Sequence, residues 1–107
     1  MNKYRDRPDY ELNLAVARHL GHNPSLERGV VKIEEEFAHG KIIISSDFDP
    51  CNNPADAMPI VIDNKITVAY DHRNCVWVAY FASEISAYSD NYYRAAMEVF
   101  LMMKDDE

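Results

Sequence analysis

The sequence predicts an α+β domain in which two β-hairpins form a small antiparallel sheet packed with three helices, in the order α-ββ-α-ββ-α. Apolar residues recur with the helical period near both ends of the chain. Two pairs of apolar, β-branched runs lie between them, and a proline-bracketed segment separates the pairs. With 107 residues, 48% of them hydrophobic, we expect a single domain with its own core and frayed ends at residues 1–8 and 105–107.

The first helix is expected from Asp9 to about Leu20. Its apolar side chains share one arc of a helical wheel, and Gly21 ends it. Asn13 is the exception, because it projects into that arc. We expect a buried amide that hydrogen-bonds the backbone of a neighbouring loop, with a ligand contact as the alternative. The apolar arc comprises Tyr10, Leu12, Leu14, Val16, Ala17 and Leu20.

A β-hairpin is predicted next, between Gly29 and Ser45, with its turn at His39-Gly40. Its first strand alternates apolar and charged side chains, whereas its second contains three consecutive isoleucines at 42–44. Such a run predicts burial on both faces or a sheet covered by a helix. The triplet Glu34–Glu36 is expected to be a solvated edge, where charge discourages the addition of another strand.

The segment between the hairpins holds the most information per residue. Asn53 followed by Pro54 is a helix-start signal, since the Asn side chain accepts a first-turn amide and proline has no N–H to satisfy there. Asp56 then lies at the positive end of the helix dipole. Because Pro59 removes an intrahelical hydrogen bond, the helix should be short and stop by Asn64.

A second hairpin is predicted from two runs rich in β-branched and aromatic residues, 65–70 and 75–81, joined by a short polar connection. Trp77 is expected to be a core aromatic on a central strand. The last helix should run from Tyr92 to about Lys104. It is apolar around most of its circumference, so we expect the sheet and the other helices, or a second subunit, to surround it.

Three segments, at the start, middle and end of the chain, carry a resemblance: Asp9-Tyr-Glu-Leu-Asn13 with 15–21, the Cys-Asn-Asn-Pro-Ala-Asp-Ala core of 49–64, and Arg94-Ala-Ala-Met97 with 99–103. On these residues the chain resembles the NinX-like family of small proteins from lambdoid bacteriophages and prophages. It departs from the family at Met58, where Trp is commoner, and at 90–93, where an Asn-Pro helix start is usual. The resemblance implies a phage origin and the cytoplasm of a bacterial host, with no reaction and no catalytic residues to carry over.

Charge is uneven along the chain. Residues 1–28 hold five Lys/Arg and four Asp/Glu, a net of +1, whereas residues 29–107 hold six and fourteen, a net of −8. A surface of that sign repels phosphate backbones, so we expect no direct nucleic-acid binding. It suits a basic protein partner or serves solubility alone, and mimicry of a nucleic acid is a further alternative.

No membrane segment or secretory leader is expected, because no apolar run approaches the roughly 20 residues that cross a bilayer and the first twenty residues are charged throughout. Two cysteines without paired-ligand or redox spacing favour the cytoplasm.

Oxygen and sulfur atoms in the central segment raise the question of a metal site. A calcium loop that began at Asp47 would need Gly at its sixth position and Glu at its twelfth, where this chain has Asn52 and Met58. One cysteine is too few for zinc, and the acids around Cys51 disfavour a thiolate nucleophile. We therefore expect no metal, no cofactor and no catalytic residue.

Two functional classes remain. The first is a non-enzymatic accessory protein that binds a host or phage protein through an acidic surface, with pairing of two copies through the last helix as an option. The second is a small-molecule or metal-binding protein with a pocket between the 53–64 helix and the second hairpin. The expected contact residues are Asp47, Asp49, Cys51, Asn52 and Asp56; Trp77 or Tyr80 would form the pocket wall, and Asn13 its polar anchor.

Overall fold

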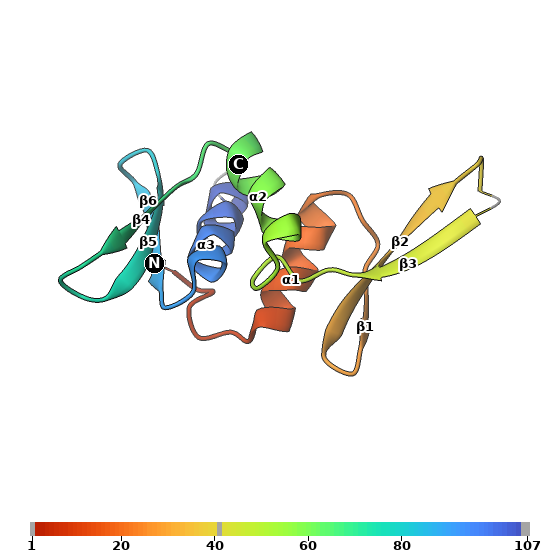
Figure 1. Ribbon diagram of the computed structural model, residues 1–107, viewed down its shortest axis with the longest axis horizontal. Helices are drawn as coiled ribbons and strands as arrows, with labels where there is room; N and C mark the ends of the chain where they lie inside the picture. Colours follow the sequence, from red (N-terminus) through yellow and green to blue (C-terminus); the bar gives the residue numbers. More distant parts are fainter. Residues whose placement is uncertain (1, 41, 106–107) are drawn as a thin grey trace.

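In residues 2–40 and 42–105, the part of the chain that the computed structural model describes, three helices form a layer between two three-stranded antiparallel sheets (Figure 1). The molecule measures 52 × 27 × 22 Å, because the two sheets lie at opposite ends. The predicted α+β class and the alternation of helices with hairpins are confirmed. Each hairpin carries one additional strand, and the strands form two sheets where we expected one.

The first sheet has the order β1 (Ser25–Glu27), β2 (Val30–Phe37), β3 (Ile42–Asp47). The two-residue turn Arg28-Gly29 joins β1 to β2, with φ of 54° and 80°. Positive φ at both positions gives the primed turn that two-residue hairpins favour. β1 was not expected from the sequence, because an arginine seldom adopts this conformation and therefore gives no turn signal.

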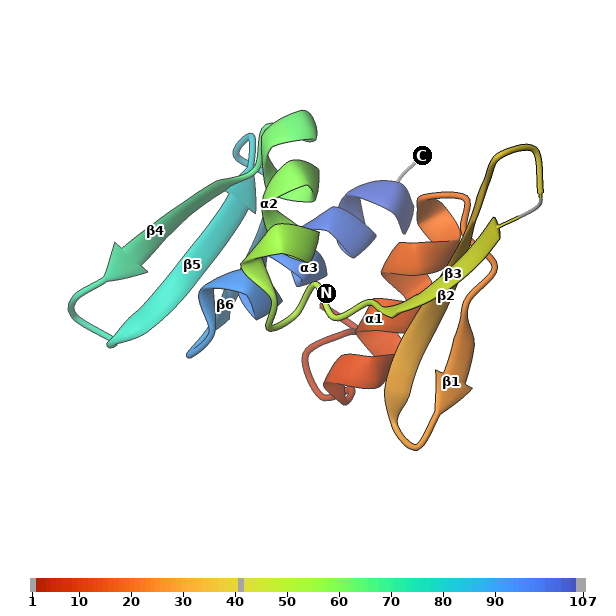
Figure 2. The same cartoon turned by 45° about the vertical axis from the view of Figure 1, so that its right-hand side comes forward.

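β2 and β3 form a long ribbon that is packed only at its base. Val31 and Ile33 are buried there, whereas Ile43 and Ile44 near the tip are 58% and 50% exposed. The predicted burial of the isoleucine run is therefore wrong for these two residues, because the ribbon extends past α1 and α2 (Figure 2). The side chain of Ile42 lies outside the described residues.

The second sheet has the order β4 (Thr67–Asp71), β5 (Val76–Phe81), β6 (Ile85–Ser89). The helix α3 (Tyr92–Asp105) packs across β5 and β6 and also contacts α1 and α2. All of its residues from Arg94 to Leu101 are buried. The prediction that this apolar helix is surrounded is confirmed, and elements of its own chain surround it.

The other two helices follow the local signals closely. α1 (Asp9–His19) ends one residue before the expected position, and α2 (Pro54–Asp63) begins where the Asn-Pro pair predicts. The side chain of Asn53 accepts a hydrogen bond from the backbone N of Ala55 at 3.0 Å. A proline lies inside α2, and the helix is correspondingly short.

The segment before α1, which we expected to fray, lies against α3. Tyr4 is 8% exposed, and its hydroxyl donates a hydrogen bond to Asp105 at 2.5 Å. Burial, together with this hydrogen bond, raises the pKa of Tyr4 to about 12. The contact connects the start of the chain to the end of α3.

Candidate interaction site

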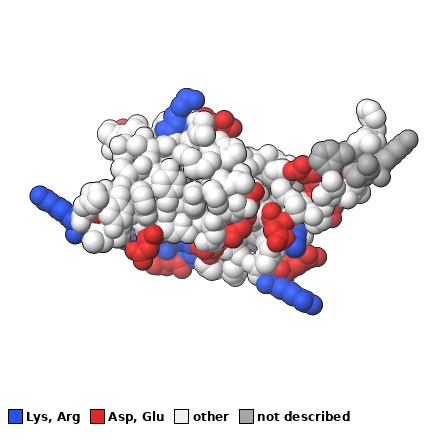
Figure 3. All heavy atoms as spheres, in the orientation of Figure 1, with Lys and Arg blue, Asp and Glu red and all other residues white. Residues whose placement is uncertain are grey.

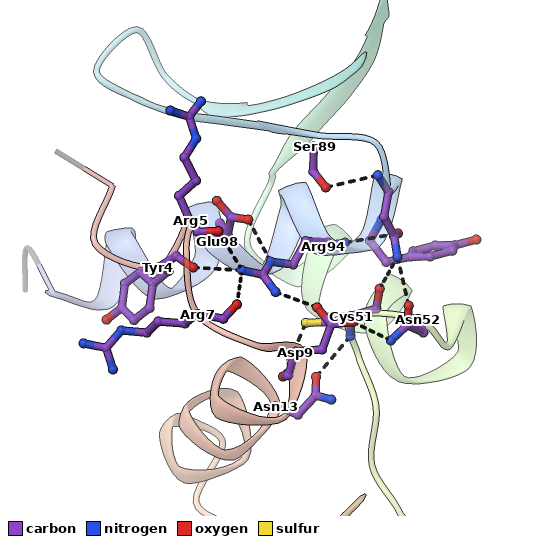
Figure 4. Close-up of polar contacts among 12 residues, drawn as sticks. Tyr4, Arg5, Arg7, Asp9, Asn13, Cys51, Asn52, Ser89, Arg94 and Glu98 are labelled. Carbon is purple, nitrogen blue, oxygen red and sulfur yellow. Dashed lines mark hydrogen bonds and ion pairs between the residues drawn. The ribbon is translucent and has the colours of Figure 1, made fainter. Parts of the chain in front are cut away.

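The segment after β3 forms a junction that holds the three helices together, which we call the helix junction: Asn13, Asp49, Cys51, Asn52 and Asn91 (Figure 4 draws most of it). Asn13 of α1 is 4% exposed. Its Oδ1 accepts from the backbone N of Cys51 at 3.2 Å, and its Nδ2 donates to Asp49 Oδ1 at 2.8 Å. The prediction of a buried amide bonded to a loop backbone is confirmed.

Asn91 connects the same segment to α3. Its Nδ2 donates to the carbonyl of Cys51 at 2.8 Å and to Asn52 Oδ1 at 3.0 Å, while its Oδ1 accepts from the backbone N of Tyr93 at 2.9 Å. A single side chain therefore caps α3 and fixes the loop beside it. Asn52 also donates to Asp9 Oδ2 at 3.0 Å, which adds a contact with α1.

The acidic residues of the motif also bond within it. The backbone N of Asp49 donates to Asp56 Oδ2 at 3.0 Å, which closes the loop onto the first turn of α2. Asp49 in turn accepts from Asn13 and Asn52. These contacts give the segment a structural role, because carboxylates that are already bonded to their own chain lose those bonds if they engage a partner.

Arg94 is the polar centre of the fold, and in the sequence its only local signal is the opposite charge of Glu98, four residues later. The residue is 9% exposed. Its Nε donates to Glu98 at 2.8 Å, its Nη1 to Asp9 at 2.5 Å, and its Nη2 to the carbonyls of Tyr4 at 2.8 Å and Arg7 at 2.7 Å. Burial by itself lowers the pKa of Arg94, but the hydrogen bonds to Glu98 and Asp9 outweigh it and raise the pKa.

The sequence signal for this site is the pair of opposite charges, Arg94 and Glu98, on an otherwise apolar helix. Glu98 is 2% exposed, and Asn2 Nδ2 donates to its other oxygen at 2.5 Å. A buried ion pair that lies i,i+4 on such a helix needs partners from elsewhere in the chain. Those partners are the backbone of the N-terminal segment and Asp9, which no local pattern reveals.

Cys51 is inaccessible. It is fully buried, with its Sγ 3.9 Å from the carbonyl oxygen of Asp9. Burial, and then the negative charge of Asp9, raise the pKa of the Cys51 thiol far above its usual range. We expected a contact residue here, but the helix junction encloses Cys51 and leaves none of its surface exposed. The other cysteine, Cys75, is exposed at the end of the β4–β5 turn.

We expected a pocket between α2 and the second hairpin, but the cavity that α2 lines lies elsewhere. Trp77 is half-buried and packs edge-on against Tyr70 and Tyr92, with ring centroids 5.0 and 5.2 Å away. The cavity beside α2, about 430 Å³, faces the first sheet instead. Its lining includes Ile33, Ser46, Asp47, Phe48, Asp56, Pro59 and Ile60, and neither Asn13, Trp77 nor Tyr80.

The charged hollow beside Arg94, about 490 Å³, has several lining side chains that already contact another residue. Arg5 lies over the ring of Tyr88 at 3.7 Å, and Asp9 is bonded to Arg94. Within residues 2–40 and 42–105, no group of three or more His, Cys, Asp and Glu side chains is placed to hold a metal ion.

One face of the ribbon presents exposed acidic side chains around an apolar one, and we call it the acidic face: Glu34, Glu36, Ile43 and Asp47. Glu36 pairs with Ile43 in the ladder, and Lys32 pairs with Asp47. Paired residues share a face and alternate along a strand, so these side chains point away from the buried Ile33. All four are exposed. Figure 3 shows acidic side chains on the half of the molecule that carries the ribbon.

Residues 3–104 match the model of the family described as Bacteriophage P22, NinX. The chain belongs to this NinX family. No curated protein and no solved structure matches this chain. The family match extends over both sheets and all but the last residue of α3, so it includes the helix junction and the ribbon alike.

Among the helices of the described part of this NinX family protein, none is both long and apolar enough to cross a membrane. Of the expected contact residues, Asp47 and Asn52 are exposed, Asp49 and Asp56 are half-buried and bonded within the motif, and Cys51 is buried. Only Asp47 belongs to the ribbon. The expected site thus divides into a structural junction and an exposed face.

Proposed function

We propose that this NinX family protein is a non-enzymatic phage accessory protein, and that its acidic face binds a basic surface on a host or phage protein in the host cytoplasm. The observation that carries the proposal is Ile43, which is 58% exposed and lies among acids on a strand that no helix covers. Singly exposed apolar residues are common on monomers, but this one lies on a projecting ribbon among exposed acids of the same face.

The composition of the acidic face argues for a protein partner. An apolar centre with a charged rim is the usual anatomy of a protein interface, where the centre supplies affinity and the rim supplies orientation. Glu34 and Glu36 have exposed side chains, whereas Asp47 is engaged by Lys32. The resulting negative field attracts lysine and arginine and repels phosphate, which favours a basic protein over a nucleic acid.

The contacts within the helix junction support the non-enzymatic part of the proposal, because they occupy the groups that could otherwise react. Its amides and carboxylates bond to one another, and its thiol is fully buried. Catalysis at the junction would require a group that is free to take a proton or attack a substrate.

Affinity capture from host cells that produce the phage proteins tests the proposal. Tagged wild-type chain is compared with Glu34→Lys/Glu36→Lys and with the matched control Asp6→Lys/Glu84→Lys, which reverses two exposed acids outside the ribbon. We expect a stoichiometric partner with the wild type and the control, and its loss with the ribbon variant, while all three unfold at the same temperature.

Direct binding of the purified partner completes the test. We expect the ribbon variant to bind at least about tenfold more weakly, and the wild-type affinity to fall as salt rises, because both changes weaken the same charge attraction. Equal binding by the ribbon variant and the wild type would overturn the proposal, and so would an equal loss in the control variant.

A further inference from the structure

We propose that the outer edge of β3 pairs with the same edge of a second copy of this chain, so that two first sheets join into one antiparallel sheet of six strands. This inference concerns the edge of the ribbon and goes beyond the proposed function, which concerns its acidic face. In the first sheet, β3 is hydrogen-bonded on one side only, to β2. Its other side presents a row of backbone N–H and C=O groups.

This edge lacks the features that normally prevent strand addition. Proteins protect edges with very short strands, with lysine or proline, or with a covering element. The opposite edge of the same sheet, β1, is three residues long and is protected by its length. β3 is six residues long, begins with three isoleucines, and has its only charged side chain at Asp47, its last residue. Ile43 and Ile44 remain half or more exposed.

The position of the acids favours a second copy as the occupant. Glu34 to Glu36 lie on β2, one strand away from the pairing edge. In a joined sheet, β2 and its counterpart would be three strand spacings apart, about 14 Å. Charges at that distance are largely screened, because the screening length is about 8 Å at physiological ionic strength. Two ribbons that stacked face to face would bring the acids to about 10 Å, which makes the edge the better place for a second copy.

The strand sequence also defines the register. Opposed residues in an antiparallel ladder share a face, so a two-fold axis must place one residue opposite its own counterpart. Centred on Ile43, the pairing sets the two exposed Ile43 side chains opposite each other on one face of the joined sheet. Centred on Ile44, it sets Ile43 opposite Ser45 on that face, so that a polar side chain takes the place of an apolar one. Asp47 lies beyond the paired segment and is bonded to Lys32.

The C-terminal helix, where we expected pairing from its apolar sequence, is a poorer surface for a second copy. Its central residues, Arg94 to Leu101, are buried within one chain. Pairing through them would require α3 to leave the second sheet. The edge of β3 requires no rearrangement, since its groups are already at the surface.

Disulfide trapping tests the pairing and its register. In a Cys75→Ser background, Ile43→Cys is compared with Ile62→Cys, which introduces a thiol at a similarly exposed isoleucine, 62% against 58%, on α2. Directly opposed Cα atoms lie about 4.5–5.5 Å apart, within the range of about 4.4–6.8 Å that a disulfide spans. We expect mild oxidation at micromolar concentration to link the Ile43→Cys chains into dimers and to leave the Ile62→Cys chains as monomers.

Light scattering with size-exclusion chromatography gives an independent readout. Wild-type chain should elute as a dimer, and Ile44→Lys should dissociate at least about tenfold more readily, because it introduces a charge on each side of the pairing edge. Ile44 lies on the opposite face of the ribbon from Glu34 and Glu36, so the proposed partner should still be captured. Glu34→Lys/Glu36→Lys should remain dimeric but lose that partner.

A monomeric wild type, or equal trapping at residues 43 and 62, would overturn the pairing and leave the proposed function standing. Dimers that persist unchanged in Ile44→Lys would also overturn it, since another surface would then hold the copies together. If Glu34→Lys/Glu36→Lys loses the partner but stays dimeric, the proposed function is supported and the dimer is shown not to depend on the acidic face.

Discussion

The two sheets of this protein have three strands each, but a helix packs across the second sheet and only the base of the first is covered. α3 packs across β5 and β6, and Ala79 at the centre of the second sheet has no exposed surface. In the first sheet α1 covers only the base of β2, and Ile43 is 58% exposed. An apolar strand therefore indicates that burial of its side chains is favourable. It does not indicate whether the same chain provides the surface that buries them.

The connections after the sheets explain the difference. Asn91 caps α3 directly after β6, so the helix returns across the sheet that precedes it. After β3, the helix junction bonds the chain to α1 through Asn13 and to α3 through Asn91. α2 therefore begins beside the other helices and leaves the tip of the ribbon uncovered (Figure 2).

The largest effect should come from the polar centre of the covered half. Arg94→Ala removes the partner of Glu98 and leaves carbonyls of the N-terminal segment unbonded, so we expect a loss of about 3–5 kcal/mol in the free energy of unfolding, measured with urea. Arg7→Ala is the control, because its exposed ion pair with Glu11 contributes about 0–1 kcal/mol.

If Arg94→Ala does not fold, the free energy of unfolding is measured for Arg94→Lys instead. Lysine keeps the positive charge but cannot donate in the directions of a guanidinium, so a clear loss is still expected. A stability equal to that of the control would contradict the assignment of Arg94 as the polar centre.

The next largest effect should come from the helix junction. Asn13→Ala leaves the backbone N of Cys51 without its partner and removes one of the two amides that donate to Asp49 Oδ1, which should cost about 1–3 kcal/mol in the same measurement. Asn23→Ala, on an exposed connection, should change stability by less than about 0.5 kcal/mol. Equal effects of the two substitutions would show that the junction does not hold the helices together.

The pH dependence of stability should report the burial of Cys51. Because its pKa is raised in the folded protein, the thiol keeps its proton when the unfolded chain loses it above about pH 8.5. The free energy of unfolding should therefore fall as pH rises beyond that value, by at most about 1.4 kcal/mol per pH unit from this group.

Cys51→Ala should flatten that slope, whatever its effect on stability at neutral pH. The comparison is best made below about pH 10, since the raised pKa of Tyr4 adds a decrease of the same sign above that point. An identical slope with and without the thiol would contradict the enclosed position of Cys51.

The smallest effect is expected at the tip of the ribbon. Ile43→Ser should change the stability of the monomer by less than about 0.5 kcal/mol, because a side chain that is mostly exposed loses little on removal. Ile33→Ala, at the buried base of the same ribbon, should cost about 2–5 kcal/mol. Urea unfolding at chain concentrations low enough for the monomer compares them, and a large cost at Ile43 would mean that its own chain covers it.

Local chemistry made the helices predictable. Asn53 and Pro54 start α2 as expected, and the amide of Asn13 bonds the loop that its position in an apolar arc suggests. The errors concern contacts between distant segments. Arg94 finds its partners some ninety residues away, and the exposure of Ile43 depends on where α2 goes. Sequence periodicity carries no information about either.

The central claim is that the ribbon meets the partner and that the helix junction does not. A photo-cross-linking amino acid placed at residue 43, on the acidic face, is compared with one at residue 55, exposed where α2 leaves the junction. In phage-producing host cells, we predict a cross-link to another protein from residue 43 and none from residue 55. A cross-link from residue 55 alone would contradict the claim and return the contact site to the segment around Cys51.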